Sequence, residues 1–220
     1  MARYQRNTVI YTDDKGETFN IALPGTTTSK DFVTFPWEPT VWQLPDGTVM
    51  MFTRNNDRRL VQDGGYPPWK RLLWAKSDDQ GETWSKLKPV PIETISSRMH
   101  VLPMFNKQRF VMVHNDTTKA VTSNWTSGRV NLSLFFNRSG YIDFVAGIGI
   151  TDENQKPPVC YPQMFIKDDA IYGIYSQGRT AQRSIRGFKV SPLPDPDDYF
   201  VFPRSNITNN LDFYTTPKLD

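Results

Sequence analysis

The chain has 220 residues, and its 26 Lys and Arg against 23 Asp and Glu give a formal net charge of +3. So small an excess, scattered along the sequence, provides no basic stripe for nucleic acid, and no apolar run approaches the length of a membrane span. The only cysteine, Cys160, excludes a disulfide within the chain.

Short β-prone segments separated by turn signals run through the whole sequence. Aromatic residues make up 13% of the chain, prolines number 17, and long amphipathic helix patterns are missing from the sequence. This combination predicts an all-β protein with many turns. In chain order, the predicted strands cover residues 7–12, 41–45, 48–54, 71–77, 110–115, 130–136, 142–148, 164–166, 170–176, 187–191 and 199–203.

Two turn segments match each other closely. Residues 12–19 read Thr-Asp-Asp-Lys-Gly-Glu-Thr-Phe, and residues 77–84 read Ser-Asp-Asp-Gln-Gly-Glu-Thr-Trp. Ser, Thr and Asp side chains at these positions stabilise a tight turn between two strands, and Gly81 supplies a backbone conformation that other residues avoid. A calcium loop is the alternative interpretation, which we do not favour because the further acidic ligands of such a loop are missing.

The repetition predicts the fold. A turn of this kind in successive units of short strands is typical of β-propellers, whose blades are four-stranded sheets. A degraded third copy lies at residues 137–140. The sequence therefore predicts a partial propeller of about three and a half four-stranded blades, with the half blade first. The expected units are 1–35, 36–97, 98–157, and 158–220, the last including a C-terminal tail.

The turn at 77–84 resembles the Asp box, or BNR repeat, of sialidases. A more specific resemblance lies in four landmarks that follow one another in the order of that family. They are Glu38 within Trp-Glu-Pro-Thr-Val-Trp-Gln, Arg54 sixteen residues later, Arg129 in Gly-Arg-Val-Asn-Leu-Ser-Leu, and Tyr161 in Tyr-Pro-Gln-Met. The chain thus resembles the C-terminal portion of the sialidase (neuraminidase) superfamily, whose propeller has six blades and a site at its axis.

The resemblance implies a role for each landmark. Tyr161 is the expected nucleophile, and Glu38 is the expected base, because a phenol with a pKa of about 10 needs a neighbouring carboxylate to react near neutral pH. Arg54 and Arg129 are expected to bind the carboxylate of sialic acid or a related acidic sugar through paired guanidinium hydrogen bonds. Since Glu38 precedes a proline, we expect extended backbone there.

The loop after Arg54 is expected to contribute to the site. Loops at such positions shape pockets, so we expect Tyr66 and Trp69 to line it. No cofactor or metal is implied, and His100 and His114 lack partners at zinc-ligand spacing. The resemblance favours a secreted or periplasmic location for the full-length protein.

The sequence departs from the family pattern at its start. The family's first arginine and its acid/base aspartate precede the matched region, and Arg3 and Arg6 stand too close to the first turn to replace them. We therefore expect a fragment of a longer protein or a chain that has lost full activity. Three functions stay open: an exo-acting glycoside hydrolase, a non-catalytic carbohydrate-binding propeller, and a scaffold. Exposed blade edges also predict self-association.

Overall fold

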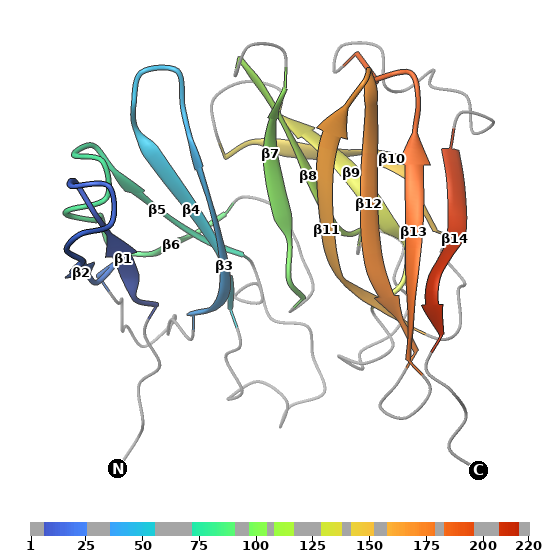
Figure 1. Cartoon of the computed structure of the whole chain (residues 1–220), viewed down its shortest axis with the longest axis horizontal. Helices are drawn as coiled ribbons and strands as arrows, with labels where there is room; N and C mark the ends of the chain where they lie inside the picture. The colour runs from blue at the N-terminus through green and yellow to red at the C-terminus, as the bar shows by residue number, and fades with distance from the viewer. Residues whose placement is uncertain are drawn as a thin grey trace.

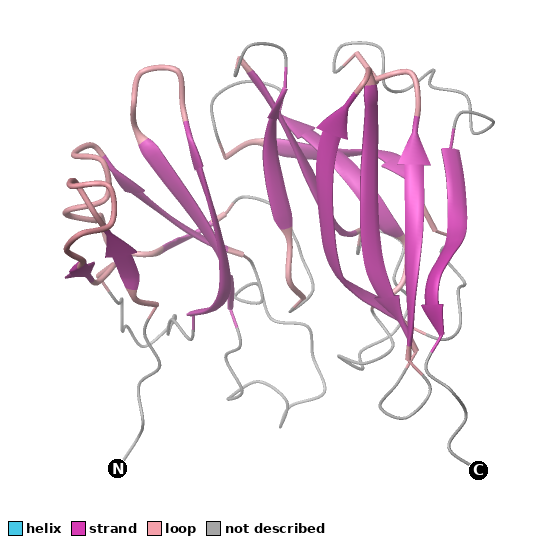
Figure 2. Cartoon of the chain, in the orientation of Figure 1, coloured by secondary structure: helices cyan, strands magenta, loops and turns pink. Residues whose placement is uncertain are grey.

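The computed structural model describes residues 7–25, 36–55, 72–90, 97–104, 108–116, 129–137, 142–151, 158–178 and 183–195, and the backbone of 207–215. Across these segments the protein consists of strands and connecting turns (Figure 2), which confirms the all-β prediction. Within the same segments, no helix has the length and apolarity needed to cross a membrane.

Four antiparallel sheets make up the described chain, and within each sheet the strands are ordered as in the sequence. The first sheet pairs β1 (Val9–Tyr11) with β2 (Asn20–Ala22). The second contains β3 (Pro36–Gln43), β4 (Val49–Asn55), β5 (Leu73–Ser77) and β6 (Lys88–Pro89). The third contains β7 (His100–Met104), β8 (Arg109–Asn115), β9 (Leu132–Asn137) and β10 (Phe144–Gly149). The fourth contains β11 (Val159–Lys167), β12 (Ala170–Gln177), β13 (Ser184–Val190) and β14 (Ile207–Thr215).

The sheets form an open array, with the first sheet at one end and the fourth at the other (Figure 1). Large apolar side chains fill the space between the second and third sheets and between the third and fourth. Between the second and third sheets, Trp42 meets Phe52 edge-on, with ring centroids 4.7 Å apart, and Phe110 and Phe144 join the same cluster. Burying one such side chain stabilises a fold by ~1.5–3 kcal/mol. These inter-sheet layers therefore hold the array together.

The third and fourth sheets are joined by a second apolar layer and by a polar contact. Val111, Leu134, Tyr175 and Phe188 belong to this layer, and all four are essentially buried. At its edge, the backbone amide of Met164 donates a hydrogen bond to Nδ1 of His100 at 3.2 Å. Burial lowers the pKa of His100, with a further contribution from Arg98, and a neutral imidazole suits its role as acceptor.

The last strand differs from the prediction. The predicted strand at 199–203 lies outside the described residues, whereas residues 207–215 form β14, which pairs with β13 from Val190 opposite Ile207 to Ser184 opposite Thr215. The segment reads Ile-Thr-Asn-Asn-Leu-Asp-Phe-Tyr-Thr, and Asn and Asp are depleted in strands. Its backbone pairing with β13 overrides that weak local preference.

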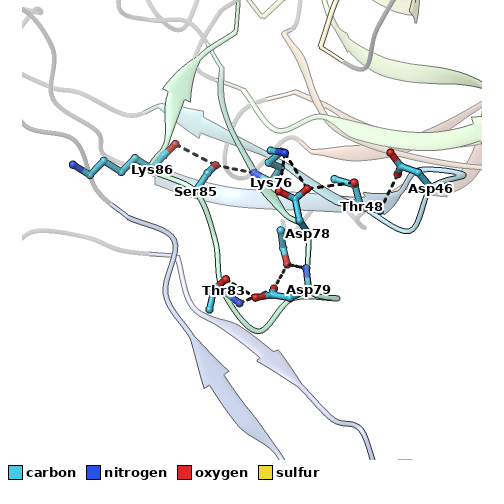
Figure 3. Close-up of polar contacts among 9 residues, drawn as sticks. Asp46, Thr48, Lys76, Asp78, Asp79, Thr83, Ser85 and Lys86 are labelled. Carbon is cyan, nitrogen blue, oxygen red and sulfur yellow. Dashed lines mark hydrogen bonds and ion pairs between the residues drawn. The ribbon is translucent and has the colours of Figure 1, made fainter.

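The two matching turn segments, 12–19 and 77–84, adopt the same hydrogen-bonded structure, and we call them the Asp turns. In the second, the Ser77 hydroxyl donates to Asp79 Oδ1 at 2.7 Å and accepts from the amide of Gly81 at 2.7 Å. Both the amide and the hydroxyl of Thr83 donate to the Asp79 carboxylate (Figure 3). The first turn repeats these contacts among Thr12, Asp14, Gly16 and Thr18, at 2.6–2.9 Å.

Backbone and indole complete the second Asp turn. Gly81 has φ 108°, a conformation that glycine adopts at little cost. The Trp84 indole donates to the carbonyl of Gly81 at 2.9 Å and packs on the small buried cluster of Leu73, Ala75 and Leu87. Through Trp84, the hydrogen-bonded turn is thus packed against the apolar side chains of its own sheet.

We expect Asp79→Asn to lower the thermal midpoint of unfolding at pH 7 by a few degrees, because an amide replaces one of the two acceptor oxygens with a donor. The Thr83 hydrogen bonds lower the pKa of Asp79 from 3.8 to about 2. The folded-state pKa is below the unfolded one, so the carboxylate stabilises the fold above pH 3.8, and this contribution is lost as pH falls towards 2. Circular dichroism melts over this range should show the difference between wild type and variant shrinking.

Asp78→Asn is the matched control. Asp78 is 63% exposed and pairs with Lys76 at 2.7 Å, and an exposed pair of this kind contributes about 0–1 kcal/mol. Equal losses from the two substitutions would contradict a structural role for the Asp79 hydrogen bonds.

Apolar side chains are exposed on the terminal sheets of the array. On the first sheet, Ile10 lies directly opposite Ile21, and they are 64% and 70% exposed. On the fourth sheet, Phe165 stacks on Tyr172 with centroids 5.4 Å apart, and Ile174, two residues after Tyr172 on β12, is 41% exposed. Exposed apolar side chains gathered on one face mark sites of association, so these two faces are candidates for it.

We expect the 220-residue chain to self-associate, and Ile174→Lys to weaken that association about tenfold or more, because burying an unpaired ammonium costs several kcal/mol. Sedimentation velocity over a concentration series measures the effect. Gln80→Lys is the control, because it adds the same charge at a turn position that holds Lys15 in the first Asp turn. A wild type that stays monomeric at every concentration would refute the expectation.

Candidate functional site

Glu38 and Arg54 come together at one end of the second sheet. Trp37 of β3 lies opposite Arg54 of β4, so Glu38 follows directly at the rim. Arg54 Nη1 donates to Glu38 Oε2 at 3.0 Å, with the arginine side chain 5% exposed and the glutamate 27%. The Arg54 guanidinium also lies 5.3 Å from the centroid of the Trp37 ring. The pair is thus a largely buried ion pair supported by an aromatic face.

Two β-bulges with the same local conformation present Glu38 and Tyr161. The register of the β3–β4 pair shifts between Trp37 and Thr40, and that of β11–β12 shifts between Cys160 and Gln163. Within the bulges, Glu38 has φ 51° and Tyr161 has φ 57°. The expectation of extended backbone at Glu38 is therefore wrong: its following proline disfavours the right-handed helical region, and the bulge directs the residue to the left-handed one.

Left-handed backbone at a residue with a side chain costs of order 1–3 kcal/mol and persists only where the surroundings impose it. Both bulged residues are followed by proline, and the strands that carry them, β3 and β11, begin at the same end of the array, the lower end in Figure 1. The same device therefore turns a carboxylate and a phenol towards one rim on two different sheets.

Arg129 lies beside Tyr161, with its guanidinium carbon 5.6 Å from the centroid of the phenol ring. The backbone around Arg129 is tied to the start of β11, because the amide of Val159 donates to the Arg129 carbonyl at 2.7 Å. Asn115, at the end of β8, strengthens this junction: its side-chain amide donates to the carbonyls of Val130 at 2.9 Å and Val159 at 3.1 Å. The junction fixes Arg129 relative to Tyr161.

The pKa of the Cys160 thiol responds both to Glu38 of the second sheet and to the arginines around Tyr161. This thiol is buried immediately before Tyr161. Burial raises its pKa, the charges of Arg129 and Arg183 lower it, a hydrogen bond from Arg129 lowers it further, and the charge of Glu38 raises it. Charges contributed by three different sheets therefore act on the thiol at the start of the fourth sheet.

The four landmark residues thus form two contacting pairs, Glu38 with Arg54 and Arg129 with Tyr161. Glu38 bonds to Arg54 rather than to the Tyr161 phenol. Tyr66 and Trp69 lie outside the described residues. Sequence reasoning missed Asn115, whose signal was a lone amide ending the apolar run Phe110–Val113, and it missed Arg183, which precedes a strand as Arg129 does.

No three His, Cys, Asp or Glu side chains in the described segments lie close enough together to hold a metal ion. The polar groups assembled at this rim are guanidiniums, a carboxylate and a phenol. Guanidinium groups of this kind can bind anions through charge-assisted hydrogen bonds.

The sequence matches a known protein family. A family model described as BNR repeat-like domain matches residues 2–174. The sequence has no significant match among curated proteins.

Several solved structures share the fold. A GH43 β-1,3-galactosidase superposes with a TM-score of 0.59 at 12% identity, over 94% of this chain and 40% of its own. An α-L-arabinanase of Penicillium chrysogenum gives 0.55 at 15% identity, over 88% and 54%. A leech intramolecular trans-sialidase gives 0.52 at 17% identity, over 77% and 24%. The chain thus spans a quarter to about half the length of these proteins, and its fold is that of β-propeller glycosidases.

We expect Asn115→Leu to lower the free energy of unfolding by about 1–3 kcal/mol, because two buried carbonyls lose their donor. Chemical denaturation followed by fluorescence measures the change. Gln43→Leu serves as the control, since Gln43 makes one exposed hydrogen bond, to the carbonyl of Gly47 at 3.2 Å, and should shift stability by less than about 0.5 kcal/mol. An Asn115 effect no larger than the Gln43 effect would show that the junction does not need this amide.

Proposed function

This chain belongs to the BNR repeat-like domain family, and we propose that it carries part of a sialidase-like exo-glycoside hydrolase site that acts on terminal sialic acid or a related acidic sugar. The observation that supports the proposal most is the placement of Tyr161 and Glu38 in matching bulges, each beside an arginine. A phenol and a carboxylate presented in this way, with cations next to both, suit attack on an anionic sugar.

In the proposed reaction, the Tyr161 oxygen attacks the anomeric carbon and its proton passes to Glu38. Arg54 engages Oε2 of Glu38, so Oε1 is the oxygen that receives the proton. The glycosidic bond breaks and the leaving oxygen takes a proton from water, while an aryl glycoside forms between the sugar and the Tyr161 oxygen. Water then attacks the anomeric carbon, the Tyr161 oxygen leaves and recovers its proton from Glu38, and the sugar is released with retained configuration. A neutral phenol suits this role because a carboxylate nucleophile would repel the anionic substrate.

The leaving oxygen also needs a proton, and no residue of this chain is assigned as its donor. General acid help typically contributes ~10²–10⁴-fold, so we expect turnover by this chain alone to be slow. Arg54 and Arg129 are proposed to bind the substrate's anionic group. Guanidinium and carboxylate form planar, paired hydrogen bonds, which orient the sugar as well as bind it.

A non-catalytic carbohydrate-binding propeller is the second candidate. The hydrogen bond of Glu38 to Arg54 in place of Tyr161 favours it, because a base that is already engaged is less suited to proton transfer. Catalytic hydrogen bonds often tighten only when substrate is bound, so binding and turnover must be measured separately.

The test is release of 4-methylumbelliferone from its α-sialoside by the 220-residue chain. Tyr161→Phe should lower the rate roughly a thousandfold or more, to background, because the nucleophilic oxygen is gone. Tyr172→Phe, on the same sheet, is the matched control and should leave the rate unchanged.

Nuclear magnetic resonance binding of α2,3-sialyllactose separates the two candidates. Binding that depends on Arg129 without detectable hydrolysis would support the binding module. Hydrolysis that survives Tyr161→Phe would reject the proposed nucleophile, and absence of both binding and hydrolysis would reject the acidic-sugar site altogether.

A further inference from the structure

The Tyr161 ring is approached by two guanidiniums. Arg129 lies with its guanidinium carbon 5.6 Å from the ring centroid, and Arg183 lies at 5.8 Å. Arg183 is exposed and stands directly before β13, whose first residue, Ser184, pairs with Gln177, and Gln177 pairs with Val159 at the start of β11. Two cations therefore reach one phenol from two different sheets.

Each of the three larger sheets contributes an arginine to this rim, and the three are used differently. Arg54, from the second sheet, is buried and bonds to Glu38 at 3.0 Å. Arg129 and Arg183, from the third and fourth sheets, each lie over the Tyr161 ring. Guanidinium groups recognise a carboxylate through paired donors along their planar edge.

The electrostatics agree with this division. Burial raises the pKa of the Cys160 thiol beside Tyr161, and the charges of both Arg129 and Arg183 act in the opposite direction. Two like charges near one ring repel each other, and an anion bound between them would relieve that repulsion.

We propose that Arg183 acts together with Arg129 to bind the anionic group of an acidic sugar beside Tyr161. The inference rests on the proposed function, since it names a further specificity-determining residue of the same site. It adds Arg183 to Arg54 and Arg129, the two arginines already proposed to bind that anionic group.

The experiment measures affinities of the 220-residue chain by nuclear magnetic resonance titration with α2,3-sialyllactose, lactose and galacturonic acid. Sialyllactose and lactose differ only by the acidic residue. Arg183→Gln should weaken sialyllactose binding at least about fivefold, as expected for loss of a partly exposed charge-assisted hydrogen bond, and should leave lactose unaffected. Arg183→Lys keeps the charge without the planar edge and should give an intermediate affinity.

Lys189→Gln is the matched control. Lys189 lies on β13 with its ammonium 5.3 Å from the Tyr172 ring, so the substitution removes the same charge from a similar cation–π contact away from Tyr161. Circular dichroism melts should show that all three variants fold as the wild type does.

The outcomes distinguish failure of the Arg183 role from failure of the proposed function. If sialyllactose binds and Arg183→Gln has no larger effect than Lys189→Gln, the role of Arg183 is wrong and the proposed function stands. If galacturonic acid binds through Arg183 and sialyllactose does not, the role of Arg183 stands and the sialic acid assignment is wrong. If neither acidic sugar binds, both proposals are overturned.

Discussion

Burial of apolar side chains between successive sheets is the interaction on which the rest of this structure depends. No sheet of four short strands can cover its own apolar face, so each packs on the next, through the Trp42 and Phe52 layer on one side and the Tyr175 and Phe188 layer on the other. Because the strands of each sheet run in the same order, this stacking brings the corresponding ends of successive sheets to one rim. Chemistry at the rim therefore follows from packing in the interior.

The backbone at the rim is locally strained. Glu38 and Tyr161 hold left-handed backbone conformations inside bulges, which regular strand pairing would not produce. The strain is sustained by neighbours with good hydrogen bonds: Asn115 and the Arg129 carbonyl fix the start of β11, and the Glu38–Arg54 pair fixes the start of β3. Strain of this kind concentrates at functional sites in proteins generally. The Asp turns, by contrast, lie at outer connections, where their local hydrogen bonds stabilise the sheets.

The site's charges are distributed among sheets and not along one element. Arg54 is matched by a carboxylate of its own sheet, whereas Arg129 and Arg183 converge on a phenol of the fourth sheet. A ligand that interacts with all of these groups would touch three sheets at once. The affinity for such a ligand would then depend on how the sheets are placed relative to one another. The apolar layers between the sheets fix that placement and so would affect binding.

Local patterns in the sequence determined the strand class, the repeated turn and the order of the landmark residues. Asp79 and Gly81 need only their near neighbours to form their turn, and the sequence therefore predicted that structure. Only tertiary structure decided which distant groups meet. The partner of Glu38 is Arg54, and the strand at Ile207–Thr215 forms through pairing with β13. Arg183 reaches Tyr161 because β12 pairs with both β11 and β13 and so aligns the starts of these two strands. Such contacts depend on strand register and on the stacking of sheets. Both result from many weak interactions along the chain, so no single residue in the sequence reveals them.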